Sequence, residues 1–455
     1  VIGRGIKHAE LSMTALGVYE GYVNGIRLGE QVLTPGYTDY HFRVQYQSYD
    51  VTDKLVQGEN VIAALVGDGW YRGCIGIGSN RNSYGSKTKF ACCLFISYED
   101  GGEEVICTDE SWHVCQDGAL RENNIKTIER FDARKELCGW NLPGYVLPDS
   151  QNSQVQSASA AGDSDVGDGA NWHRAHPASY EGNVVQEGEL VLEHEHFTPM
   201  VLHTPDGNTV LDMGQNFAGY VQFKVAGPAG HVVALTMGEV LDENGNFTIE
   251  NYQPGERHVE GGIFQKVTYI CKEGKNVYKP HFCIFGFRYA KLEILDGLNL
   301  AEAKFTAIAV YSKMEQTAEF TCSDVNVNQL VKNSIWSQKG NFCDVPTDCP
   351  TRERAGWTGD AGVFVNTGLY LMDCYPVFRK WLGECRINQY PEGQLRNISP
   401  MNNNESFFGK LLSGSAGWGD ASVIVPYTMY QRYQDVRILE ENYEMMKGWV
   451  GFLEG

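Results

Sequence analysis

The hydrophobic periodicity of this chain changes near Ser312, and this change limits the folds that the chain can adopt. Before that point, short apolar stretches are separated by Gly-rich turns, a pattern typical of β-strands. After it, apolar residues recur at helical spacing over residues 327–335, behind the N-cap candidates Ser323 and Asp324. A β-rich part followed by an all-α part predicts separate domains rather than one mixed sheet.

The β-rich part divides into two predicted antiparallel β-sandwiches. The first, residues 1–178, contains an Asn24-Gly25 pair that predicts a tight hairpin. Residues 149–171 are rich in Ser, Gln, Ala, Gly and Asp and lack bulky apolar side chains, so we expect a flexible surface loop. The second sandwich, residues 187–313, consists of further short strands separated by turn signals.

The helical part covers residues 314–455 and holds about five predicted helices. They span residues 327–335, 363–372, 375–387, 421–432 and 438–453. Three domains agree with the length of 455 residues, which is too long for one ordinary domain.

The charge of the chain excludes several classes of partner. The formal net charge of −20 argues against nucleic acid and anionic membranes, because both require a basic protein surface. No apolar stretch approaches the ~18 residues of a membrane-spanning helix. Hydrophobic residues make up 42 % and charged residues 21 %, a soluble globular composition that suits a neutral small-molecule or glycan substrate.

The 13 cysteines include no C-x-x-C pair, and we interpret them as scattered buried free thiols. Cys92 and Cys93 are adjacent and should point to opposite faces of a strand, and a disulfide stays an open alternative that the pattern does not assign. The odd number of cysteines favours a reducing, cytoplasmic compartment. The chain begins at Val1 without a methionine or signal peptide, so we interpret this end as trimmed, and secretion stays undecided.

The densest group of polar side chains lies in residues 344–360. Within residues 348–360, three carboxylates, two guanidinium groups and one indole occur among prolines and glycines, which predicts a loop with fixed turns. Carboxylates accept hydrogen bonds from sugar hydroxyls, and a carboxyl group among other carboxylates has a raised pKa, as a general acid requires. Composition alone favours the alternative of a salt-bridged loop, in which both arginines pair with Asp348 and Asp360.

Resemblance to a known family favours a catalytic loop over a salt-bridged structural one. The run VPTDCPTRERAGWTGD, residues 345–360, resembles the signature of bacterial α-L-rhamnosidases, glycoside hydrolase family 78. Other stretches similar to this family follow in the expected order, at residues 15–20, 24–25, 33–40, 67–73, 131–136, 212–219, 285–289 and 417–421. The 345–360 motif is specific, and the resemblance covers essentially the whole chain.

The resemblance implies a fold and a reaction. The fold is β-sandwich modules followed by an (α/α)6 barrel, and the reaction is hydrolysis of terminal α-L-rhamnosyl residues with inversion. Such a barrel needs about 200 residues, so residues 314–455 are expected to form a truncated one. The implied partner is a rhamnose-containing glycoside or polysaccharide, and the implied general acid is Glu353.

The resemblance also implies the substrate-binding residues. Asp348 and Asp360 would bind rhamnose hydroxyls, and Trp357 would form an apolar wall beside the sugar. Arg352 is adjacent to the acid and is expected to hold hydroxyls or to tune it. The later stretch Gly-Trp-Gly-Asp adds Trp418 and Asp420, which we expect at the same barrel mouth.

Inversion requires a second carboxylate, the general base, about 6.5–9.5 Å from the acid. In the family this base is a glutamate from a later part of the barrel, and no residue of this chain matches it. Glu384, Glu392 and Glu405 are expected to be solvated or loop carboxylates. We therefore expect the 455-residue chain alone to be inactive or nearly so.

Other features carry less weight. His194 and His196 suggest a metal cluster but lack a third ligand, so a polar surface strand is expected. Trp70 and Tyr71 are expected to pack in the first sandwich core rather than to bind sugar. No cofactor or metal is predicted, and structural calcium stays open without a dedicated loop.

Two alternative functions remain open. One is an inverting glycosidase of other sugar specificity, and the other is a non-catalytic glycan-binding scaffold.

Overall fold

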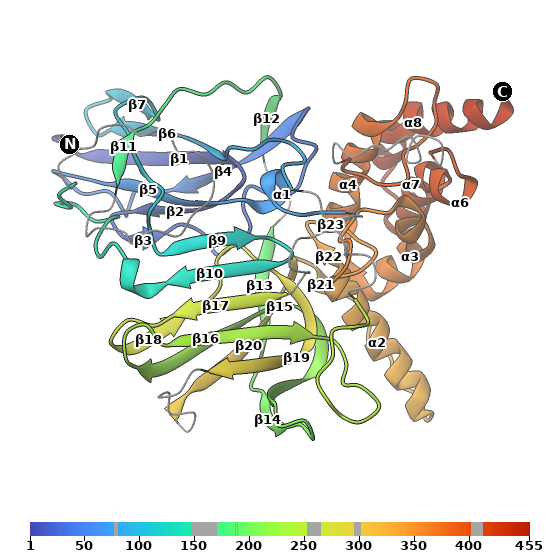
Figure 1. Ribbon diagram of the computed structural model, residues 1–455. Helices are drawn as coiled ribbons and strands as arrows, with labels where there is room; N and C mark the ends of the chain where they lie inside the picture. Colours follow the sequence, from blue (N-terminus) through green and yellow to red (C-terminus); the bar gives the residue numbers. More distant parts are fainter. Residues whose placement is uncertain are drawn as a thin grey trace.

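The computed structural model describes residues 1–76, 81–147, 171–186, 188, 190–252, 265–294, 302–401 and 413–455. Two β domains lie against each other and lead into a helical domain, which contains the C-terminus (Figure 1). The predicted order of two β parts followed by an all-α part is therefore confirmed. The expected loop at residues 149–171 lies outside the described residues, except for residue 171. Within the described residues, no helix is both long and apolar enough to span a membrane.

The first β domain is built around a five-stranded sheet. Its order is β12 (Asn183–Gln186), β4 (Arg43–Asp50), β1 (Ile6–Leu16), β6 (Lys89–Tyr98) and β7 (Glu103–Cys107). Smaller sheets join β3 (Ile26–Arg27), β2 (Val18–Val23) and β5 (Ile62–Gly67), and β11 (Trp172–Arg174) with β8 (His113–Cys115). Alternate residues of β1 are buried, which is the pattern of a strand with one face on the core. The turn predicted at Asn24 and Gly25 joins β2 and β3, and both residues have positive φ.

Two aromatic residues of this domain pack inside the protein. Trp70 and Tyr71 lie in the short helix α1 (Gly69–Arg72) and are both buried. The Trp70 ring stacks on Tyr37 with 5.5 Å between ring centroids. Both side chains are thus buried as predicted, but in a hydrophobic cluster shared with the other two domains rather than in the first domain's own core.

The second β domain contains a ten-stranded sheet. Its main path is β13 (Val191–Phe197), β20 (Lys304–Ser312), β15 (Thr209–Gly227), β19 (Phe285–Ile294), β16 (Val232–Gly238), β17 (Lys266–Ile270), β10 (Ile128–Asp132) and β9 (Leu120–Asn124). Strands β14 (Met200–His203) and β18 (Gly274–Tyr278) pair with β15. Nearly all pairs are antiparallel, but β10 runs parallel to β17, and β12 runs parallel to β4. Strands β9 and β10 thus precede this domain in sequence but belong to its sheet.

The helical domain begins with α2 (Val325–Asn341), whose N-cap Asp324 accepts hydrogen bonds from two backbone N–H groups. The other helices are α3 (Thr358–Leu371), α4 (Tyr375–Asn388), α6 (Ala416–Gly419), α7 (Ala421–Tyr433) and α8 (Arg437–Glu454). Short pairs join β21 (Glu315–Gln316) to β24 (Met372–Asp373), and β22 (Phe342–Cys343) to β23 (Val345–Pro346). Helix α8 buries Ile438, Met445 and Trp449 along one stripe, as an amphipathic helix does. The predicted helices are all present, and α2 begins earlier and ends later than expected.

Two polar predictions need correction. Cys93 and Cys107 lie opposite each other on β6 and β7 and form a disulfide, so the free-thiol prediction is wrong for this pair. The other eleven cysteines form no disulfide. His194 is half-buried rather than on an open polar strand, because its ring stacks on Tyr311 at 3.6 Å and Nε2 donates to the Tyr311 carbonyl.

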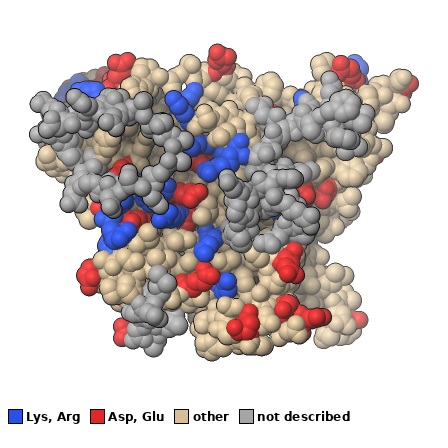
Figure 2. Space-filling view, in the orientation of Figure 1, with Lys and Arg blue, Asp and Glu red and all other residues tan. Residues whose placement is uncertain are grey.

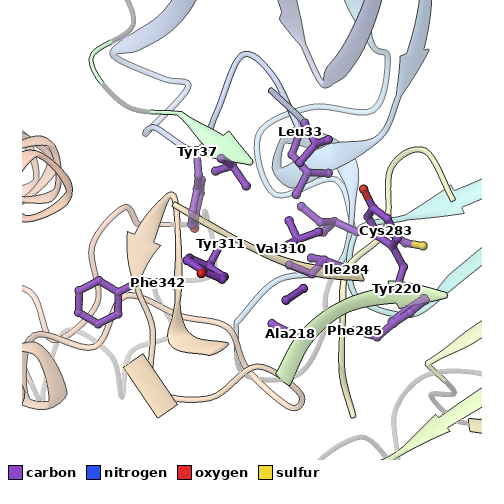
Figure 3. Close-up of a cluster of buried hydrophobic side chains, with 14 of the residues drawn as sticks. Leu33, Tyr37, Ala218, Tyr220, Cys283, Ile284, Phe285, Val310, Tyr311 and Phe342 are labelled. Carbon is purple, nitrogen blue, oxygen red and sulfur yellow. The ribbon is translucent and has the colours of Figure 1, made fainter. Parts of the chain in front are cut away.

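One hydrophobic cluster connects all three domains (Figure 3). It includes Leu33 and Tyr37 of the first β domain, Tyr220 and Val310 of the second, and Phe342 after α2. Polar contacts also cross the junction between the domains. Arg43 of β4 pairs with the fully buried Glu384 of α4. The helical domain is thus fixed to the β domains by a shared core. On the face of the molecule seen in Figure 2, acidic and basic side chains are interspersed.

Candidate functional site

The polar segment predicted to carry the chemistry forms the connection between α2 and α3. It closes on itself, because Asp348 N–H donates to the Ala355 carbonyl at 3.2 Å and Ala355 N–H donates to Asp348 Oδ1 at 3.0 Å. Arg354 has a φ of 52°, a left-handed conformation that turns the chain sharply after Glu353. Trp357 is the N-cap of α3, so the turn leads directly into a helix.

The Glu353 carboxyl group is held by a neighbouring indole. Trp357 Nε1 donates to Glu353 Oε2 at 2.7 Å, and Cys349 Sγ accepts from the Glu353 backbone N–H at 3.4 Å. The Glu353 side chain is half-buried. One carboxyl oxygen is thus fixed by Trp357, and the group keeps partial access to solvent.

Two further carboxyl groups lie within electrostatic range of Glu353. Burial raises the pKa of Asp348 above its ordinary value, and the Glu353 charge raises it further against opposing hydrogen bonds from Cys349 and Ala355. Burial also raises the pKa of Asp360, and Glu353 again adds to this shift. The structure therefore brings together the three carboxylates that were predicted from the sequence.

An aromatic wall borders these carboxylates. The rings of Trp357 and Trp418 meet edge to face with 6.3 Å between centroids. Trp418 lies in α6 and is 38 % exposed. The close approach depends on Gly359, because a Cβ atom there would lie 2.9 Å from Trp418 Nε1. Both tryptophans predicted at the site are thus neighbours.

The other two predicted residues are placed differently. Arg352 is exposed, and its charge acts on Glu239 of the second β domain, whose pKa is raised by burial and lowered in part by Arg352. Asp420 lies between α6 and α7, and its Oδ1 accepts a hydrogen bond from buried Trp449 at 3.0 Å. Asp420 therefore has a structural partner that the sequence motif did not indicate.

Of the other glutamates, Glu384 was expected to be solvated, and this prediction is wrong. Its side chain is fully buried in α4, where it accepts hydrogen bonds from Arg43 and from the Asp39 backbone N–H. Glu392 is exposed in a turn, as expected. Glu405 lies outside the described residues. Glu384 thus serves the domain junction.

The segment of residues 348–357 forms the acid loop. Sequence reasoning missed the residues of the β domains that contact this loop. Gly76 N–H donates to the Glu353 carbonyl at 2.8 Å, and Lys126 Nζ donates to the Arg352 carbonyl at 2.5 Å. Arg354 donates to the carbonyls of Pro350 and Ile125 and to Gln265 Oε1. Apart from the local bond to Pro350, these contacts join residues at least 89 positions apart in the chain, so no local pattern indicates them.

A half-buried carboxyl group with two further carboxyl groups in electrostatic range and two indoles beside it is a set of side chains that suits a sugar ligand. Three family models cover successive parts of the chain. They are the α-L-rhamnosidase N-terminal domain (residues 4–166), the bacterial α-L-rhamnosidase concanavalin-like domain (202–311) and the bacterial α-L-rhamnosidase six-hairpin glycosidase domain (315–455). The chain belongs to the bacterial α-L-rhamnosidase family.

Individual relatives agree with this assignment. An α-L-rhamnosidase of Streptomyces avermitilis is 34 % identical over 99 % of this chain, and one of Formosa agariphila is 32 % identical over 98 %. The crystal structure of Streptomyces avermitilis α-L-rhamnosidase complexed with L-rhamnose aligns over the whole chain with a TM-score of 0.87 and 33 % identity. The chain spans 40 % and 45 % of the two relatives and 41 % of the solved chain.

Proposed function

We propose that the protein containing this chain hydrolyses terminal α-L-rhamnosyl residues with inversion, and that Glu353 is its general acid. The observation that carries the proposal is the hydrogen bond from Trp357 to the Glu353 carboxyl group, which has two further carboxyl groups within electrostatic range. A general acid must be held in a fixed position within reach of the leaving oxygen. The relatives named above and the solved complex with L-rhamnose support rhamnose as the sugar.

The proposed binding residues surround this acid. Asp348 and Asp360 would accept hydrogen bonds from sugar hydroxyls, and Trp357 would contact the apolar side of the ring. Trp418 would extend this wall, since the two indole rings meet edge to face. Arg352 would bind hydroxyls from the exposed side of the loop. Asp420 would act through Trp449 and the start of α7 rather than by direct contact.

We further propose that the general base comes from a part of the protein outside these 455 residues. The relatives named above are more than twice as long as this chain. Within the described residues, Arg43 pairs with the buried Glu384 carboxylate, so this group cannot activate water. An inverting mechanism would place the base about 6.5–9.5 Å from Glu353.

Substitution of the acid tests its role in the longest natural form of the protein. Glu353→Gln should lower kcat/KM by about 10²–10⁴-fold on rhamnosides with poor leaving groups. On activated aryl rhamnosides kcat/KM should fall much less, because nitrophenolate is a good leaving group that does not need to be protonated. Glu392→Gln removes an exposed loop carboxylate and should change neither value. Equal losses on both kinds of substrate would rule out acid catalysis by Glu353.

A panel of nitrophenyl glycosides tests the sugar and the location of the base. The longest form should release nitrophenol from the α-L-rhamnoside and not from other glycosides. The isolated 455-residue chain should be inactive or nearly so on the same substrate. Turnover by the isolated chain at the rate of the longest form would mean that its own residues supply the base.

A further inference from the structure

The turn that precedes β10 reaches the acid loop of the helical domain. Residues 125–127 are fixed to the second β domain, because Ile284 N–H donates to the Ile125 carbonyl at 3.0 Å and Lys266 N–H donates to the Thr127 carbonyl at 2.9 Å. Between these two anchors, Lys126 is fully buried. Its ammonium group donates to the Arg352 carbonyl at 2.5 Å. A rigid β element therefore holds the residue directly before Glu353.

The residue after Glu353 is held by the same turn. The Arg354 guanidinium donates to the Ile125 carbonyl at 2.9 Å and to Gln265 Oε1 at 3.1 Å. Gln265 is itself fixed, because it exchanges two hydrogen bonds with the Gly286 backbone. The Glu353 carbonyl accepts from Gly76 N–H. Three consecutive residues, 352–354, are thus supported from outside the helical domain.

We propose that Lys126 is a positioning residue for the general acid. The inference rests on the proposed role of Glu353 as that acid. A buried ammonium group is costly to desolvate, but its charge strengthens the hydrogen bond to a carbonyl oxygen. Lys126 fixes the backbone on one side of Glu353, as the Trp357 indole fixes its carboxyl group. Acid catalysis requires both, because a displacement of about 1 Å can cost roughly 100-fold in rate.

The test compares Lys126→Met with a matched control in the longest natural form of the protein. Methionine keeps the length and the apolar stem but removes the donor. The control is Lys272→Met just after strand β17, where Lys272 makes a partly exposed ion pair with Glu136. Lys126→Met should lower kcat on poor leaving groups by roughly 10- to 100-fold, with KM nearly unchanged and a smaller loss on nitrophenyl rhamnoside. The control should match the unmodified protein on both substrates.

The outcomes separate this proposal from the proposed function. If Glu353→Gln shows the leaving-group effect but Lys126→Met behaves like Lys272→Met, the positioning role is wrong and the acid assignment stands. If Glu353→Gln lacks the effect, the acid assignment itself fails. Should Lys126→Met not fold, Lys126→Gln keeps a polar side chain at this position but shortens it, which weakens the bond to the Arg352 carbonyl. A folded Lys126→Gln protein that lacks the leaving-group effect would overturn the proposal.

Discussion

Asp348 has a structural role and a proposed chemical one. Its Oδ1 accepts the Ala355 N–H and closes the acid loop, while its second oxygen is proposed to bind the sugar. Burial and the charge of Glu353 raise the pKa of this carboxyl group in the folded protein. Because the folded pKa lies above the unfolded value, the ionised carboxylate destabilises the fold at neutral pH. This loss of stability disappears as the pH falls below the ordinary value of 3.8.

Asp348→Asn should therefore raise the melting temperature at pH 7 and lower activity. The asparagine oxygen can still accept from Ala355, but the buried charge is absent. The gain in melting temperature should shrink as the pH falls, since both proteins are then neutral at this position. Thermal melts at pH 7 and pH 4, together with KM for nitrophenyl rhamnoside, measure the two effects. A lower melting temperature at pH 7 would show that the charge is well compensated.

At the scale of elements, the contact between α3 and α6 sets the aromatic wall. Gly359 lies in the first turn of α3, directly below the Trp418 ring. Gly362 lies one turn later, where an added Cβ would meet Ala421 at an ordinary 3.4 Å. The two glycines of one helix thus differ in how closely the neighbouring chain approaches them.

Gly359→Ala should displace Trp418 and weaken substrate binding. Overpacking typically costs about 1–3 kcal/mol, of which the better helix propensity of alanine recovers about 1 kcal/mol. KM should rise while kcat changes less, because the acid and its Trp357 donor are untouched. Gly362→Ala is the matched control and should leave KM unchanged with equal or higher stability. Similar KM values for both variants would contradict a binding role for Trp418.

The sequence predicted elements well where the pattern was local. The five longer helices, the Asn24-Gly25 hairpin and the Asp324 cap follow from apolar spacing and turn chemistry. The parallel pairing of β10 with β17 was not predictable, because it joins segments far apart in the chain. The same limit applies to Glu384, whose burial depends on Arg43 in another domain. Within the site, the motif predicted the carboxylates and tryptophans, and only the fold revealed Lys126 beneath them.

At the scale of the whole molecule, the junction between β4 and α4 contains an ion pair between fully buried Glu384 and largely buried Arg43. Glu384 is fully buried, and burial raises its pKa, while Arg43 opposes this shift. The same helix carries Arg379, which pairs with Glu441 at the surface. Removal of one partner from a buried pair leaves an uncompensated charge, which is far more costly than loss of a surface pair.

Arg43→Met should destabilise the protein by about 3–5 kcal/mol at neutral pH. Arg379→Met, the surface control on α4, should cost less than about 1 kcal/mol. The loss in Arg43→Met should diminish at lower pH, because the pKa of unpaired Glu384 rises further and the group then becomes neutral. Urea unfolding at pH 8 and pH 5 checks both the size and the sign. A loss that does not depend on pH would point to packing rather than charge.

Strands β9 and β10 complete the sheet of the second β domain, although the chain reaches them before that domain begins. A recombination event between residues 133 and 190 would therefore separate β10 from β17, its parallel neighbour. The same event would remove the hydrogen bonds that hold the turn at Lys126 to the second β domain. We expect the two β domains and the start of the helical domain to be inherited together. Substitutions on either side of the β10–β17 seam should then be selected jointly.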